Sequence, residues 1–289
     1  NSHKGWMSVP KNIEEENKIF NKGIFNRNEV KSSGFLSKYC LKYLEGRDIH
    51  RYYIDEVEKY VFAKKIDIPE VSNNKIWVYY SKQAKVNYIA FVGGGGMKGN
   101  PTKSGNPVAK FGKNFREAGS NYYIFPNPKK KKVLNNRKTK DHIKRISILI
   151  DHIKKQNNLP IVLLGHSRGS ISVAHAANEI GKGRIDGIVI LASITDTNGS
   201  KKTPNTKTMR YMLKNPKVPV LVVHHEKDGC NVTRYSSAKS LAKKHNFKLV
   251  TITGGGTTGE VCGPFHYHGF ENKMPEVIQA VHSWSSTLK

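Results

Sequence analysis

The chain has 289 residues, 37% of them hydrophobic, which favours one large domain over two small ones. No apolar run approaches the roughly 18 residues that a membrane-spanning helix needs, so no transmembrane segment is expected. The chain carries 49 Lys and Arg against 22 Asp and Glu, a formal net charge of +27 at pH 7. This charge favours an anionic surface as a partner, but no zinc-finger, RNA-binding or basic-zipper pattern accompanies it, so a specific nucleic-acid partner is not expected. Abundant Lys, Asn and Ile also fit an AT-rich genome, which explains many lysines but not the shortage of acidic residues.

The first 47 residues are polar and lysine-rich and have no strong periodicity. A segment of this size without cross-links is too small for a separate domain. We therefore expect an extension at 1–47, packed on or flexibly attached to a domain at 48–289. Residues 1–10 do not resemble a signal peptide, so any export signal is expected to be missing from this chain.

From residue 51 the pattern changes to alternating strands and helices. Strands are expected where β-branched, aromatic or continuous apolar runs occur, at 60–68, 75–80, 88–92, 121–125, 161–164, 185–192, 218–223 and 247–252. Helices are expected at 111–118, 138–156, 170–180, 208–213, 234–244 and 274–288. This alternation predicts an α/β protein with a mostly parallel central sheet, helices on both faces and an antiparallel opening made by the first two strands.

A sharp turn follows the strand at 161–164. Residues 165–169 read Gly-His-Ser-Arg-Gly, a G-x-S-x-G pattern between a strand and a helix. The two glycines allow a strained turn that lifts Ser167 above the sheet, and the backbone N–H of Arg168 then points to the same place. The pattern by itself also occurs by chance, so the other parts of such a site must follow in the required order.

An acid is expected after a later strand, because the carboxyl ends of parallel strands meet at one edge of the sheet. Asp228, in the loop after the strand at 218–223, is our candidate. Glu226 lies nearer the strand end and is interpreted as a surface or loop-shaping residue. Asp196, after the preceding strand, is the main rival, and Asp228 could also be an ordinary turn aspartate.

The base is expected after the last strand. Four histidines follow Asp228, at positions 245, 266, 268 and 282. His245 and His282 fall in predicted helices, whereas His266 and His268 lie in the loop between the last strand and the closing helix. We favour His268, because His-Gly-Phe before a helix leaves the imidazole free to approach the serine. It would accept the serine proton, while the carboxylate fixes its tautomer.

A run of four glycines, 93–96, ends the buried strand at 88–92. In sites with a serine nucleophile on such a turn, backbone N–H groups form an oxyanion hole, and the second of them comes from this position. We therefore expect the amides of Gly95 and Gly96 to form the oxyanion hole together with the amide of Arg168. A glycine run also suits a flexible loop or a phosphate cradle, but no G-K-[ST] follows it.

The three cysteines, Cys40, Cys230 and Cys262, show no zinc or redox spacing. Cys230 lies two residues after the candidate acid, and Cys262 lies six before the candidate base. A bond between them would tie the two loops together and would indicate an oxidising compartment. Two unrelated buried thiols are the alternative.

These segments together resemble exported bacterial α/β-hydrolases without a large cap, over roughly 60–289. The segments are 93–96, 165–169, 224–230 and 262–270. The resemblance implies the α/β-hydrolase fold, serine-hydrolase chemistry and a periplasmic or secreted location. It also implies the roles of Ser167, Asp228 and His268, and a disulfide from Cys230 to Cys262. The extension and the high charge depart from the family.

The leading hypothesis is a hydrolase that cleaves small or polymeric carboxylic esters through an acyl-enzyme, as a monomer without metal or cofactor. Thioesters and amides are the nearest alternatives within this class. The alternative from another class is a basic module that binds an anionic surface and has weak or lost catalysis.

Overall fold

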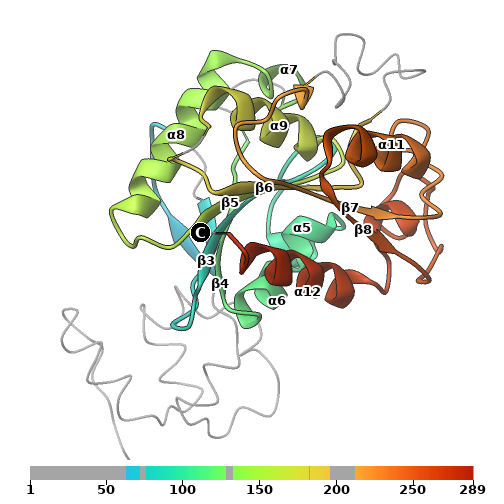
Figure 1. The fold of residues 1–289 in the computed structure, drawn as a ribbon. Helices are drawn as coiled ribbons and strands as arrows, with labels where there is room; N and C mark the ends of the chain where they lie inside the picture. The colour runs from blue at the N-terminus through green and yellow to red at the C-terminus, as the bar shows by residue number, and fades with distance from the viewer. Residues whose placement is uncertain (1–62, 72–75, 128–132, 182, 196–211, 289) are drawn as a thin grey trace, which may run out of the picture. The chain divides into compact units, whose positions relative to one another are not determined.

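The computed structural model describes residues 63–71, 76–127, 133–181, 183–195 and 212–288 (Figure 1). Lys65–Lys289 forms one compact unit. The predicted extension at 1–47 and its boundary with the domain lie outside the described residues and stay a prediction.

A central sheet of eight strands has the order β1-β2-β4-β3-β5-β6-β7-β8. The strands are β1 (Ala63–Ile66), β2 (Ile76–Tyr79), β3 (Val86–Phe91), β4 (Ser120–Ile124), β5 (Ile161–His166), β6 (Gly187–Leu191), β7 (Val220–His225) and β8 (Lys248–Ile252). β2 runs antiparallel to β4, and all pairings from β4 to β8 are parallel. The predicted mostly parallel sheet is therefore confirmed.

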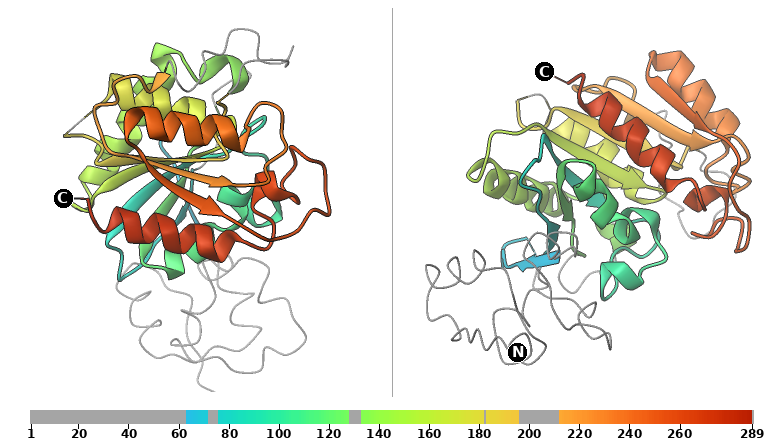
Figure 2. Two further views of the ribbon diagram at one scale, coloured as in Figure 1. Left: turned by 45° about the vertical axis from the view of Figure 1, so that its right-hand side comes forward. Right: turned by 90° about the horizontal axis from the view of Figure 1, so that it is seen from below.

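Helices cover both faces of this sheet (Figures 1 and 2). The main helices are α6 (Gly112–Glu117), α8 (Lys140–Lys154), α9 (Gly169–Glu179), α11 (Tyr235–His245) and α12 (Met274–Ser285). α8, α9 and α11 lie on one face, and α6 and α12 lie on the other. The carboxyl ends of the parallel strands therefore share one open edge between the two layers.

Both faces of the sheet bury apolar side chains. On the face of α8, α9 and α11, aliphatic residues of the strands, together with aromatic ones such as Phe91, pack against the isoleucines, leucines and alanines of the helices. On the other face, Tyr88 of β3 and Tyr122 of β4 pack against Phe115 of α6, with centroid distances of 5.5 and 4.7 Å. The Tyr88 hydroxyl also donates to Ser285 Oγ of α12 at 2.9 Å. Burial on both faces explains why β3 and β5 are almost continuous apolar runs.

Several short helices differ from the expected elements. The segment 97–107, where no helix or strand was predicted, holds the 3-10 helix η2 (Pro101–Lys103) and the start of α5 (Pro107–Lys110). Each begins with an Asn-Pro pair, in which the side chain of Asn100 or Asn106 accepts a backbone N–H of the first turn. Asparagine at the cap and proline at the first position are a signal for the start of a helix. These helices were not predicted, because they are too short to show a helical pattern of apolar residues. Another short helix, α7 (Val133–Asn136), also lies in a predicted loop, and the helix predicted at 208–213 falls mostly outside the described residues.

β7 runs two residues further than expected, through His224 and His225. Both side chains are buried, and their Nε2 atoms lie 2.6 Å from the carbonyl oxygens of Thr233 and Gly254. A buried polar group is tolerated in a strand when it has such a partner. The extension carries the strand to the edge of the candidate site.

Candidate active site

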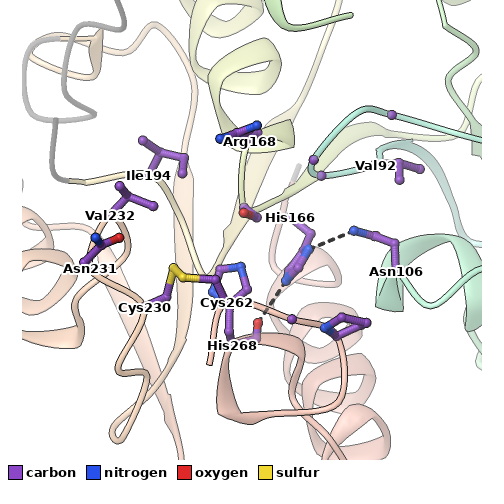
Figure 3. Close-up of a pocket in the computed structure, with 16 residues that line it drawn as sticks. Val92, Asn106, His166, Arg168, Ile194, Cys230, Asn231, Val232, Cys262 and His268 are labelled. Carbon is purple, nitrogen blue, oxygen red and sulfur yellow. Dashed lines mark hydrogen bonds between the residues drawn. A yellow bond between two sulfur atoms is a disulfide. The ribbon is translucent and has the colours of Figure 1, made fainter. Parts of the chain in front are cut away.

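A cavity of about 440 Å³ opens at the carboxyl ends of β3, β5, β6 and β7 (Figure 3). Its walls come from the glycine loop after β3, the turn after β5 and the loops that hold the disulfide. Ser167, Arg168 and His268 of the predicted site all line it. The structure thus brings residues more than 100 positions apart in the chain into one cavity.

The turn after β5 has the strained backbone of a nucleophile elbow. Ser167 has φ +51°, in the left-handed region, and its N–H donates to the carbonyl of Leu191 on β6 at 2.9 Å. The flanking glycines are required by space. A Cβ added at Gly165 would lie 2.6 Å from the carbonyl oxygen of Gly169, and one added at Gly169 would lie 2.0 Å from that of Phe91. The motif therefore lets α9 pack directly on the elbow.

Asp228 and His268 meet beside the cavity. His268 Nδ1 lies 3.0 Å from Asp228 Oδ2, and Thr233 Oγ1 donates to the same oxygen at 3.0 Å. The backbone N–H of Cys230 donates to Asp228 Oδ1 at 3.0 Å, and His224 Nε2 lies 3.2 Å from Oδ2. Because the carboxylate accepts from Nδ1, the Nε2 lone pair of His268 is free to act as a base.

The same contacts keep the carboxylate charged. Burial, the largest influence, acts to raise the pKa of Asp228, but hydrogen bonds from His224 and His268 and the attraction of both imidazoles lower it. The net pKa lies below the ordinary value of 3.8. The Ser167 hydroxyl makes no hydrogen bond to any other described residue, and such bonds are often long before substrate binds.

His166, the residue before the serine, links the elbow to the histidine loop (Figure 3). Its Nδ1 lies 3.1 Å from Asn106 Nδ2, and its Nε2 lies 2.9 Å from the backbone oxygen of His268. Asn106 uses its oxygen to cap α5 by accepting the Val108 N–H, so its amide nitrogen must donate to Nδ1. His166 is therefore a neutral imidazole that donates from Nε2 to the His268 carbonyl. Burial, and then the neighbouring His268, lower the pKa of His166 to about 3.

The glycine loop borders the cavity. Gly93, Gly94 and Gly96 line it, and Gly95 is not among the described lining residues. The N–H of Gly96 donates to the Gly93 carbonyl at 2.9 Å, which closes a turn. Gly96 has φ +82°, and a Cβ there would lie 2.1 Å from Asn127 Oδ1. The role of Gly96 in the structure is therefore to form the loop.

Arg137 holds this loop in place by hydrogen bonds to its carbonyl oxygens, a role that the sequence did not suggest. Its Nη2 donates to the carbonyl oxygens of Val92 at 2.8 Å and Gly94 at 3.4 Å, and its Nη1 donates to Ser172 Oγ on α9 at 3.0 Å. The side chain is buried, and burial, followed by the nearby charge of Arg168, lowers its pKa to about 9. A lone arginine outside any motif carries no signal in a single sequence.

The rival candidates lie elsewhere or outside the described residues. The His282 ring packs against the Tyr88 ring, with 5.2 Å between the ring centroids, on the face of the sheet that α6 and α12 cover. His245 lies in the last turn of α11. His266, which precedes the 3-10 helix η3 (Tyr267–Gly269), has no hydrogen-bond partner for Nδ1 among the residues described. Glu226 is exposed, and Asp196 is outside the described ranges.

Cys230 and Cys262 form the disulfide that was predicted. It joins the acid loop to the loop before His268, and both cysteines line the cavity. Figure 3 shows the sulfur bridge beside His268. The bond therefore holds together two loops that contribute to the site.

Removing this disulfide should lower the free energy of unfolding. A closed loop of 32 residues limits the unfolded chain and should contribute about 3.5 to 4 kcal/mol by loop entropy. We expect the Cys230→Ser/Cys262→Ser double variant to lose this amount in guanidinium denaturation. Dithiothreitol should cause a similar loss in the wild-type protein and none in the double variant. Equal stability of the reduced and oxidised proteins would contradict a stabilising role.

In the part of the chain that the structure describes, no group of three or more His, Cys, Asp or Glu side chains is arranged to hold a metal ion. No helix there combines the length and apolar character needed to cross a bilayer.

Comparison with known proteins extends these observations. Residues 128–263 match the serine hydrolase family model, a stretch that includes the elbow and Asp228 and stops before His268. No curated protein matches the chain.

Solved structures with a similar fold include a Xanthomonas campestris α/β serine hydrolase without a lid, XC6422. It is 14% identical with a TM-score of 0.50, over 78% of this chain and 94% of that one. The Pyrococcus furiosus esterase PF2001 is 11% identical with a TM-score of 0.56, over 81% and 93%. Thermogutta terrifontis esterase 2, phosphonylated by sarin in its structure, is 13% identical with a TM-score of 0.56, over 77% and 93%. At such low identities the likeness shows the fold alone. The protein therefore has the α/β-hydrolase fold, and its match to the serine hydrolase family over residues 128–263 indicates a hydrolase.

Proposed function

We propose that the protein hydrolyses carboxylic esters through an acyl-enzyme formed on Ser167. The observation that carries this proposal is the 3.0 Å contact between His268 Nδ1 and Asp228 Oδ2, beside a cavity that Ser167 and His268 both line. The family match and the strained elbow support it. Thioesters and amides would follow the same steps and are the alternatives to be tested.

The residues divide the reaction as follows. His268 Nε2 takes the proton of the Ser167 hydroxyl while the oxygen attacks the ester carbonyl carbon. The tetrahedral intermediate collapses with cleavage of the bond to the leaving alcohol, which receives the proton from His268. Water then attacks the acyl-enzyme by the same route and releases the acid. Asp228 holds the Nδ1–H tautomer throughout and balances the imidazolium.

Two backbone amides are proposed to bind the oxyanion. The N–H of Arg168 lies at the N-terminal end of α9, next to Ser167. For the second donor we now favour Gly94 over the predicted Gly95 and Gly96. Gly94 lines the cavity and donates to no backbone carbonyl among the residues described, whereas the Gly96 amide is used in a turn.

The disulfide supports a place of action. Bonds of this kind form and persist mainly in oxidising compartments. We therefore propose that the protein works in the periplasm or outside the cell. The anionic surface partner, which rests on the net charge, and the monomeric state remain predictions.

Covalent labelling tests the proposed chemistry. A fluorophosphonate probe should label the wild-type protein at Ser167, as mapped by peptide mass spectrometry, because it reacts with serines activated by a neighbouring base. The Ser167→Ala variant should not be labelled, and Ser240→Ala, at an exposed position on α11, should be labelled normally. A panel of ester, thioester and amide substrates of graded chain length then ranks the substrate classes. Unchanged turnover of p-nitrophenyl esters by Ser167→Ala would overturn the proposal.

A further inference from the structure

An unpaired arginine stands beside the nucleophile. Arg168 lines the catalytic cavity, and Figure 3 shows its side chain between Ile194 and Val92. Within the described ranges its guanidinium has no hydrogen-bond acceptor and no ion-pair partner, and it is partly exposed. A guanidinium offers several donors in a rigid fork that suits a carboxylate or a phosphate. The cavity therefore holds an unused site for an anion.

No described side chain in the cavity wall neutralises this charge. The described residues that line the cavity include no Asp or Glu. Asp228, next to the cavity, already accepts from His268, Thr233 and the Cys230 amide. Ion pairs of Lys and Arg lie elsewhere in the described residues. They join Lys113 to Glu117, Arg184 to Asp151 and Lys273 to Glu276.

A second cation lies behind the first. Arg137 is buried, bonds only to the Val92 and Gly94 carbonyls and Ser172, and has no carboxylate partner in the described part of the chain. Its Nε has no hydrogen-bond partner there either. The charge of Arg168 contributes to the lowered pKa of Arg137, so the two guanidinium groups lie close enough to repel each other. An anion bound at Arg168 would relieve this repulsion in a region of low dielectric.

We propose that the natural substrates are esters that carry a carboxylate or another anionic group close to the scissile bond, which the Arg168 guanidinium binds. The proposal rests on the ester hydrolysis proposed above. Apolar wall residues such as Val92, Ile194 and Val232 suit a short carbon chain between the reacting carbonyl and that anion. The alternative is that Arg168 is only solvated, as on an ordinary basic surface. That alternative predicts no preference between charged and neutral esters.

Matched ester pairs isolate the charge. The first pair is p-nitrophenyl hemiadipate and p-nitrophenyl hexanoate, which share a six-carbon acyl chain and differ in a terminal carboxylate. The second pair is 4-carboxyphenyl hexanoate and 4-carbamoylphenyl hexanoate, which place the charge in the leaving group. Each kcat/KM is divided by the hydroxide rate of the same ester, which removes intrinsic reactivity. We expect the wild-type enzyme to prefer the anionic member of at least one pair by about tenfold at low salt.

Variants assign the preference to one side chain. In Arg168→Gln the anionic-to-neutral ratio should fall to about one, and in Arg168→Lys it should be partly retained because the charge remains. The ratio is read within each variant, so a general change in activity cancels. Lys239→Gln, an exposed site on α11, removes the same charge elsewhere and should keep the wild-type ratio. Because Arg168 is partly exposed, added salt should reduce the preference.

The outcomes separate this proposal from the proposed function. If Ser167 is labelled and neutral esters are cleaved, but neither pair shows a preference, the anionic substrate class is wrong while ester hydrolysis stands. A preference that survives in Arg168→Gln would also overturn the role of Arg168. If Ser167→Ala retains wild-type ester turnover, the proposed function itself fails.

Discussion

Exchanging Asp228 for asparagine is expected to lower kcat by about 10⁴-fold and to leave KM within about threefold. The Cys230 N–H donates to Asp228 Oδ1, so an asparagine would place its carbonyl there and its NH₂ group at the Oδ2 position. That NH₂ would face His268 Nδ1, which would then have to accept a hydrogen bond. The proton of the imidazole would move to Nε2, and the base could no longer accept the serine proton. Steady-state kinetics on a p-nitrophenyl ester, with circular dichroism as a folding check, measures the effect.

The control for this variant is Glu226→Gln, two residues away and exposed. It removes the same charge from the same loop without touching His268, so kcat should stay within about twofold. If Asp228→Asn retains more than a tenth of the wild-type kcat at neutral pH, Asp228 does not set the tautomer. The acid would then have to come from elsewhere, with Asp196 as the first alternative.

The stability of the protein should fall between pH 7 and pH 4.5, in part because of His166. The unfolded chain binds a proton at this residue below its ordinary pKa of 6.5, whereas burial keeps the folded state neutral until the pKa of about 3. The unfolded state therefore binds more protons in this range, and the free energy of unfolding decreases as the pH falls. From these two pKa values, His166 accounts for a loss of about 2 to 3 kcal/mol between pH 7 and pH 4.5.

His166→Gln should remove this contribution. Glutamine does not titrate, and its amide can still donate to the His268 carbonyl that His166 Nε2 now binds. The variant is expected to be less stable at pH 7, because it loses the bond from Asn106, but to lose about 2 to 3 kcal/mol less than wild type on going to pH 4.5. Urea denaturation across this pH range, with the disulfide intact, measures the difference.

A second histidine variant serves as the comparison. His245→Gln, at the partly exposed end of α11, should change the pH dependence less. The neighbouring ionisable residues His268, Asp228 and His224 are the same in the wild type and in His166→Gln. Parallel stability curves for wild type and His166→Gln would show that His166 is not held neutral in the folded state.

Short-range steric limits explain why the serine turn could be predicted from the sequence. The backbone of Gly169 leaves no room for a Cβ at Gly165, and the backbone of Phe91 leaves none at Gly169. The strands at 161–164 and 218–223 were found, although each runs two residues further in the structure, to His166 and His225. Three of the four extra residues, His166, His224 and His225, are histidines, whose burial depends on carbonyl partners from other loops and so leaves no local signal.

The sequence favoured His268 over His266, two residues away in the same loop, and the imidazole of His268 is the one that lies against Asp228. The contact itself depends on packing between distant loops. In the glycine run every residue has the same side chain, so the turn that uses the Gly96 amide and leaves Gly94 in the cavity wall is invisible in the sequence. Arg137, His166 and the empty guanidinium of Arg168 acquire their roles only from neighbours far along the chain.

By itself the sequence determined the alternation of strands and helices, the position of the serine turn, the order of acid and base after it, and the pair of cysteines that could bridge them. These features follow from the periodicity of apolar residues, the steric limits of turns and the order of strands in a parallel sheet. All three can be recognised in a single sequence because they depend on neighbouring residues or on chain order. The tertiary structure decided how the histidine meets the carboxylate, which tautomer His166 adopts, which glycines line the cavity and that no carboxylate among the described residues of its wall balances Arg168. These depend on hydrogen-bond partners and charges brought together by the folding of distant segments.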